Sequence, residues 1–181
     1  MKPKETASVW SVCVRVLHWT LAFSMILSFA THESGLVWHE YFGYVALAAA
    51  SVRVAAGFVG SGYWRFSHFL RSISVTFEYA KDVFKHRERR YLGHNPLGGW
   101  MVILLLGDAI ATGLTGWLFT TDRFWGVKWL EELHGALGEA LVPLLVLHIA
   151  GAIFTSYRHR ENLIAAMLHG RKPAPTSGDI V

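Results

Sequence analysis

The chain has a single cysteine, Cys13, among its 181 residues. It therefore forms no internal disulfide bond, and its cysteine content says nothing about the redox state of its compartment. The same scarcity excludes the C-x-x-C-H motif that attaches a c-type haem covalently. We also find no internal repeat. The interpretation must therefore rest on how apolar, charged and histidine residues are distributed.

Charged residues are scarce in four long apolar blocks, at residues 9–30, 38–59, 98–119 and 133–154. With 52% hydrophobic residues, the chain is too apolar for an ordinary soluble domain. Each block is close to the ~20 residues that a helix needs to cross a bilayer, and none alternates with the period of two of a barrel strand. The sequence therefore predicts an all-α fold, a four-helix transmembrane bundle. No small-residue cleavage site follows the first block, so we expect a retained helix and not a signal peptide.

Lysine and arginine are almost absent from two of the three connections. The first, a short turn near Ser34 and Gly35, has none, and the third has only Arg123 and Lys128. The long second connection, residues 60–96, and the two ends of the chain carry most of the others. By the positive-inside rule, both termini and the long connection are predicted to be cytoplasmic, in a multi-pass protein of a bacterial inner membrane. Since the membrane explains the net charge of +4, we expect no nucleic-acid partner.

The long connection also contains apolar residues at helical spacing, from Phe66 to Phe84. This spacing predicts a cytoplasmic amphipathic helix between the second and third spans. Such a helix is either an anchor on the inner membrane surface or a docking surface for a soluble partner. Residues 1–172 are expected to form one membrane domain. Residues 173–181, rich in Pro and other small residues, are expected to be a disordered cytoplasmic tail.

Four histidines lie inside the apolar blocks: His18, His39, His134 and His148. Ionisable side chains are rare in membrane helices and are usually functional there. The predicted topology places His18 and His148 near the cytoplasmic face, and His39 and His134 near the periplasmic face. His134 and His148 are 14 residues apart, which is about 21 Å along a helix and nearly four full turns, so both point the same way.

Two histidines at each membrane face predict two haems, because a low-spin haem iron takes two axial ligands. Bis-histidine ligation suits electron transfer, since it leaves no open position for a substrate. Without thioether bonds, both are expected to be non-covalent b-type haems. Gly43 and Gly138, each one turn after a histidine, would give the macrocycle clearance. Gly107, Gly113 and Gly116 are expected to permit close helix packing.

Two arginines accompany the predicted inner pair. Arg15 is one turn before His18, and Arg53 follows His39 by 14 residues, on the same helix face but at cytoplasmic depth. Both are expected to bind haem propionates through bidentate contacts. The alternative is that they extend to the cytoplasmic interface.

An ordered set of short motifs spans nearly the whole chain. The motifs are Arg15-x-x-His18-Trp19, His39-x-x-x-Gly43 with Arg53 following, Gly93-His94-Asn95-Pro96-Leu97-Gly98, and His134-x-x-x-Gly138 with His148-x-x-Gly151. Together they resemble the bacterial cytochrome b-561 and nickel-iron-hydrogenase cytochrome b-subunit family. The resemblance implies a four-helix bundle, two b haems with the four histidines as axial ligands, and exchange of electrons with membrane quinone.

The segment His94-Asn95-Pro96 joins the basic connection to the third block. Pro96 suits the first position of a helix, and the Asn95 side chain suits its cap. The functional alternative is that His94 or Asn95 hydrogen-bonds a quinone carbonyl beside the inner haem, with His94 also passing protons.

We therefore expect a respiratory-chain cytochrome that transfers electrons between quinone, a diffusible redox partner, and a periplasmic cytochrome c or redox enzyme subunit. No residue is assigned a catalytic role, and the protein could be an electron carrier or an oxidoreductase subunit. One alternative is a superoxide oxidase that delivers electrons to ubiquinone, with Arg123 and Lys128 attracting the anion. A more remote one is a histidine-lined metal transporter, although the helices offer few carboxylates beyond Asp108 and Glu139.

Overall fold

The computed structural model describes residues 5–33 and 36–181. Its contacts divide the chain into two compact units. The first unit comprises the chain up to Arg15, Ala56–Val102 and the residues from Leu147 onward. The second comprises Val16–Ala55 and Ile103–Val146.

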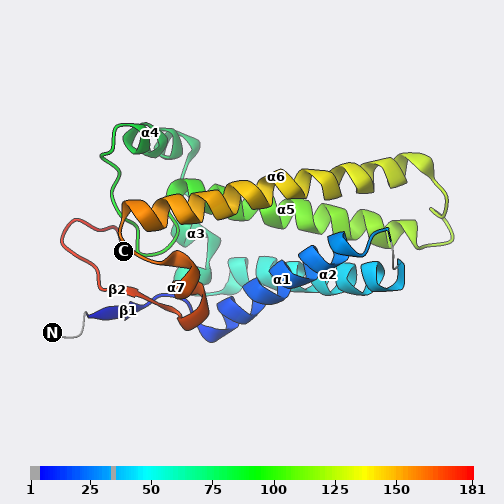
Figure 1. Cartoon of the computed structure of the whole chain (residues 1–181), viewed down its shortest axis with the longest axis horizontal. Coiled ribbons are helices and arrows are strands. Elements are labelled where there is room, and N and C mark those ends of the chain that lie inside the picture. The colour runs from blue at the N-terminus through cyan, green and yellow to red at the C-terminus, as the bar shows by residue number, and fades with distance from the viewer. Residues whose placement is uncertain (1–4, 34–35) are drawn as a thin grey trace. The chain divides into compact units, whose positions relative to one another are not determined.

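Within the described residues, four helices are long and apolar enough to cross a membrane (Figure 1). They are α1 (Val12–Ala30), α2 (Leu36–Val59), α5 (Pro96–Phe119) and α6 (Lys128–Arg158). The four predicted spans are thus confirmed as helices, and the first three end at the predicted residue. α6 is longer than predicted because more polar residues extend the helix beyond both ends of the apolar block. The predicted turn at Ser34 and Gly35 lies outside the described residues.

In the second unit, side chains from different long helices meet. The Ser28 hydroxyl of α1 donates to the His39 carbonyl of α2 at 3.1 Å. A Cβ on Gly113 of α5 would lie 2.9 Å from Leu47 of α2, so these helices approach closely where only glycine fits. The expectation that Gly113 permits close packing is therefore supported.

The outer faces of this unit are apolar and uncovered. Four such side chains, each more than half exposed, are Phe23, Val52, Leu104 and Val146. A soluble monomer rarely exposes so much apolar surface, whereas hydrocarbon covers it at no cost. The exposed faces therefore agree with helices that contact lipid.

The first unit adds shorter elements. They are β1 (Thr6–Ser8), η1 (Gly62–Trp64), α3 (Phe66–Phe69), α4 (Ile73–Phe84), α7 (Leu163–His169) and β2 (Arg171–Pro173). β1 pairs with β2 antiparallel, Thr6 opposite Pro173 (Figure 1). Gly170 permits this pairing for two reasons. It ends α7 in a left-handed conformation, with a φ of 84°, that favours glycine. A Cβ at this position would also lie only 2.5 Å from the Trp10 carbonyl oxygen. The two terminal segments therefore lie side by side.

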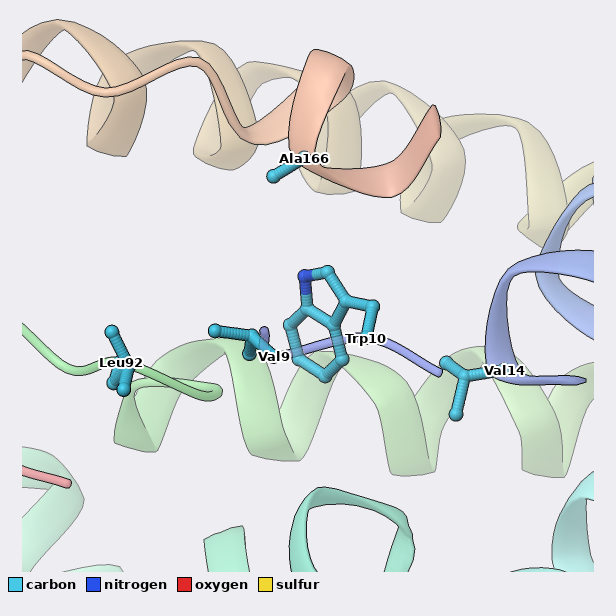
Figure 2. Packing of buried hydrophobic residues seen from close by; sticks show 5 residues of the cluster. All are labelled: Val9, Trp10, Val14, Leu92 and Ala166. Atoms are coloured by element: carbon cyan, nitrogen blue, oxygen red, sulfur yellow. The ribbon is translucent and has the colours of Figure 1, made fainter. Parts of the chain in front are cut away.

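A small apolar core joins these segments. Figure 2 shows its five buried side chains, which come from three separate stretches of the chain: Val9, Trp10, Val14, Leu92 and Ala166. The backbone N–H groups of Val9 and Trp10 donate to the Gly170 carbonyl at 2.9 and 3.1 Å. Because these donors are used outside the helix, α1 begins three residues after the start of the apolar block.

The predicted amphipathic helix from Phe66 to Phe84 is broken into two. α3 ends at Phe69, and the Ser72 hydroxyl caps a new helix, α4. Phe69 is only 2% exposed, whereas Phe84 is 85% exposed. The interruption allows Phe69 to enter the interior of the unit while α4 keeps an exposed apolar face.

The tail also differs from the predicted disorder. The backbone N–H of Ile180 donates to the Arg90 carbonyl, and its carbonyl accepts from Leu92, both at 2.9 Å. The Asp179 carboxylate lies 2.6 Å from the Arg90 guanidinium. Burial alone would raise the pKa of Asp179, but hydrogen bonds from Thr176 and Arg90 hold it below its usual value.

Arg90 connects the tail to a buried ion cluster, which we define as Arg90, Glu161, Lys172 and Asp179. Glu161 accepts from Arg90 at 2.9 Å and lies 3.0 Å from the Lys172 ammonium. Lys172 is 3% exposed, and its burial lowers the pKa of its ammonium group. Ion pairing thus holds the C-terminal segment in place, although this segment has little apolar surface to bury. Composition alone does not reveal such ion pairs.

Candidate functional site

His39 of α2 and His134 of α6 face each other in the second unit. Their ring centroids are 5.9 Å apart and their planes are nearly perpendicular, at 86°. The structure therefore brings together two histidines that the sequence predicts as a pair, from two separate helices.

Backbone carbonyls of the other two helices orient both rings. His39 Nδ1 donates to the Ser28 carbonyl of α1 at 2.8 Å, and His134 Nδ1 donates to the Thr112 carbonyl of α5 at 3.0 Å. The Thr115 hydroxyl also lies 3.2 Å from His134 Nδ1. Because a carbonyl only accepts, each neutral ring has its proton on Nδ1 and the lone pair on Nε2. Metal-binding histidines are usually held in this way.

The separation of the two rings suits one metal ion between them. An imidazole nitrogen binds a transition metal at about 2 Å, so two opposed ligands have nitrogens about 4 Å apart and ring centres somewhat further. The 5.9 Å between the centroids agrees with this arrangement. No group of three or more His, Cys, Asp or Glu among the described residues could hold a metal ion. Two neighbouring imidazoles are the donor set that a bis-histidine haem requires.

Glycines leave space around these rings. A Cβ on Gly138 would meet no atom within 4 Å, and one on Gly43 would only touch the Ser28 hydroxyl at 3.6 Å. A Cβ on Gly116 of α5 would lie 2.9 Å from His134 Cε1, so a larger residue would displace the ring. Sequence reasoning assigned Gly116 to helix packing and missed Ser28 and Thr112, because these roles depend on which helices are neighbours.

The other two predicted ligands belong to different units. His18 lies in the second, where its ring meets Trp19 edge-on with centroids 5.3 Å apart, and His148 lies in the first. Their pairing stays a prediction. Arg53 is half-buried in the second unit, and a Cβ on Gly151 in the first would meet open space.

Arg15 lies in the first unit, at the start of α1. One of its terminal nitrogens, Nη1, donates to the Leu168 carbonyl of α7. Its Nε is buried and has no hydrogen-bond partner among the described residues. Buried donors without a partner are uncommon and costly, so this N–H suits an anionic group that binds beside α1.

Aromatic rings surround His94 in the first unit. Its ring centroid lies 4.9 Å from that of Trp10 and 4.7 Å from that of Phe69. A small pocket beside it is lined in part by Tyr63 and Arg71. Burial raises the pKa of the Tyr63 hydroxyl above its usual value. The pocket thus combines apolar walls with polar hydrogen-bonding groups.

Asn95 acts as a helix cap. Its Oδ1 accepts a hydrogen bond from the Gly98 N–H at 2.7 Å, and α5 begins at Pro96 as predicted. The same side chain hydrogen-bonds Tyr79, whose pKa burial raises. The capping alternative is thereby supported, and the oxygen of Asn95 is already engaged.

The basic residues between α5 and α6 also have neighbours. Arg123 lies over the Phe124 ring at 5.6 Å, and Lys128 lies 4.0 Å from Glu132. These contacts gather no cluster of cations at this end of the second unit.

The sequence matches the family model of prokaryotic cytochrome b561 over residues 9–170. No curated protein and no solved structure matches the chain. The matched region contains all four long helices, all four membrane histidines, Arg15 and the His94 segment. A match of this extent means that the chain belongs to the prokaryotic cytochrome b561 family, and is thus a membrane b-type cytochrome that binds b-type haem and transfers electrons.

Proposed function

We propose that this protein transfers electrons between membrane quinone and a periplasmic redox partner through two b-type haems, each held by two histidines. The observation that carries the proposal is the close pair His39 and His134, with a centroid separation of 5.9 Å. Two histidines fill both axial positions of an iron, which favours electron transfer over substrate binding.

His39 and His134 would hold the outer haem. When bound, the haem iron supplies one-electron oxidation and reduction. The carbonyls of Ser28 and Thr112 accept hydrogen bonds from Nδ1 of the two rings, so Nε2 of each ring would be the nitrogen available to the haem iron. Since these carbonyls belong to α1 and α5, all four long helices would help to position the ligands.

His18 and His148 would hold the inner haem, because the sequence predicts both near the cytoplasmic face. Arg15 and Arg53 would bind its propionates. The buried Nε of Arg15 fits this role, because a carboxylate would supply the hydrogen-bond acceptor that it lacks among the described residues.

Quinone would bind near His94. The aromatic rings of Trp10 and Phe69, which contact His94, suit an apolar head group, and the imidazole can bond a carbonyl oxygen or accept a proton from a quinol. Asn95 supports the site indirectly, since its oxygen caps α5.

The orientation follows from the charge bias, with both termini on the cytoplasmic side of a bacterial inner membrane. The pairing of β1 with β2 supports termini on one side. The periplasmic partner would be a cytochrome c or a redox enzyme subunit. A fusion reporter attached after Val181 should be active in the cytoplasm, and periplasmic activity would exchange the sides of both haems.

Histidine substitutions test the haem assignment. We expect the wild-type protein to bind two b haems, and His39→Ala and His134→Ala each to remove the same one. His18→Ala and His148→Ala should remove the other. The measurements are haem per protein and reduced-minus-oxidised spectra, with the non-ligand His32→Ala as control. Loss of the same spectral component from His39→Ala and His18→Ala would overturn the pairing.

A further inference from the structure

Helix α4 is held firmly by one side. Tyr79 is 8% exposed, its ring meets Tyr91 edge-on with centroids 5.5 Å apart, and its side chain hydrogen-bonds Asn95. The Ser72 hydroxyl caps the first turn. α4 is thus a fixed part of the first unit, and its remaining faces keep a defined direction.

The start of α4 lies level with the start of a candidate membrane span. The Trp100 indole N–H donates to the Arg71 carbonyl at 3.1 Å, and a Cβ on Gly99 would lie 3.0 Å from the Phe69 carbonyl oxygen. Both contacts involve residues among the first five of α5, within about 6 Å of its beginning at Pro96. In a bilayer, this level corresponds to the boundary between head groups and acyl chains.

An apolar stripe on α4 is uncovered. Ile73, Phe77 and Phe84 are 62%, 65% and 85% exposed. Their spacing of four and seven residues places them within about 40° of one another around the helix. The stripe is separate from the buried Tyr79 side, so it needs an apolar surface outside the chain.

Charge is ordered beside this stripe. The exposed Lys81 and Lys85 lie about 80° and 120° around the helix from Ile73, and the acidic Glu78 and Asp82 follow at about 140° and 180°. Apolar residues come first, then lysines, then acids. An amphipathic helix in an anionic membrane surface has its apolar residues in the acyl boundary and its lysines at the phosphates.

We infer that α4 is a lipid-binding helix, whose stripe Ile73, Phe77 and Phe84 enters the membrane surface while Lys81 and Lys85 bind the phosphates of anionic phospholipids. The inference rests on the proposed function for its cytoplasmic placement. A soluble protein partner would require the stripe to stay in water until that partner arrives. The residues just before α4, however, contact the beginning of α5, which corresponds to the level of the lipid head groups.

A fluorescent label on α4 tests this. In a Cys13→Ser background, Phe77→Cys is labelled with an environment-sensitive dye, and the full chain is placed in nanodiscs of phosphatidylcholine alone or mixed with phosphatidylglycerol. We expect blue-shifted emission and several-fold weaker quenching by aqueous iodide in the anionic discs. Phe84→Cys provides a second label position should Phe77→Cys fold poorly.

Lysine variants test the role of charge. Lys81→Gln with Lys85→Gln should remove most of the difference between the two lipid mixtures, whereas the exposed Lys128→Gln should preserve it. Emission and quenching typical of a label in water, in both kinds of disc, would overturn the inference. A protein-docking surface would give this result. Equal burial in both lipids overturns the selectivity for anionic lipid. Haem content and quinol reduction are measured on the same samples, so failure of the proposed function is detected separately.

Discussion

At the scale of single residues, the outer site depends on the atoms around the two histidines. An imidazole binds iron well only if its Nδ1 proton is held elsewhere and its plane is fixed. The carbonyls of Ser28 and Thr112 provide both constraints, at 2.8 and 3.0 Å. Because these acceptors are backbone atoms, substitution of the Ser28 or Thr112 side chain would leave the carbonyls in place. A bulkier residue beside the histidine rings would instead displace the rings themselves.

Gly116 offers a direct test of crowding. We expect Gly116→Ala to weaken binding of the outer haem, because its Cβ would lie 2.9 Å from His134 Cε1 and push the ring aside. The inner haem should stay bound. Haem per protein and the potentials of the two centres are the measurements.

Gly107→Ala is the matched control, since a Cβ at Gly107 on the same helix meets no atom within 4 Å. Outer haem content and potential that are equal in both variants would show that Gly116 does not position His134.

At the scale of elements, the start of α5 combines a cap with a proposed quinone site. Asn95→Leu removes the oxygen that accepts from Gly98 and should cost about 1 kcal/mol of stability, whereas Asn95→Ser retains a capping hydroxyl and should cost less. Thermal unfolding of the purified protein distinguishes the two variants.

The neighbouring His94 carries the quinone prediction. We expect His94→Phe to slow reduction of the inner haem by quinol, because the apolar ring keeps the packing against Trp10 and Phe69 but neither donates nor accepts a hydrogen bond. The measurement is stopped-flow reduction in protein with full haem content. Unchanged kinetics in both His94→Phe and Asn95→Ser would place the quinone elsewhere.

At the scale of the whole molecule, the buried ion cluster stabilises the first unit. Glu161→Gln would leave Arg90 and Lys172 buried with one carboxylate fewer, and removing one partner of a buried ion pair typically costs about 3–5 kcal/mol. We therefore expect a clear fall in unfolding temperature and faster proteolysis of the tail.

Glu132→Gln is the appropriate control, because its partner Lys128 lies 4.0 Å away and both side chains are well exposed. Such a surface pair contributes within about 1 kcal/mol, so this variant should behave like the wild type. Equal unfolding temperatures for the two variants would mean that the cluster adds nothing to stability.

Hydropathy and residue type along the chain were enough to predict the four long apolar helices and their approximate ends. These features are local, because a helix in lipid satisfies its own backbone and needs about twenty apolar residues wherever it packs. The start of α5 at Pro96 could also be predicted from local sequence, since the backbone N–H that proline lacks would have no partner in the first turn of a helix.

Tertiary structure alone decided which atoms meet. Ser28, Thr112 and Gly116 acquire their roles at the histidines from neighbouring helices, and the ordered tail depends on Arg90, far from it in sequence. Hydrogen bonds and ion pairs are short-ranged, so their free energy depends on distances that the order of residues does not specify. Burial and hydropathy are summed along a segment and can be estimated without its partners. The sequence could therefore predict four histidines as ligands, whereas only the fold shows which atoms surround His39 and His134.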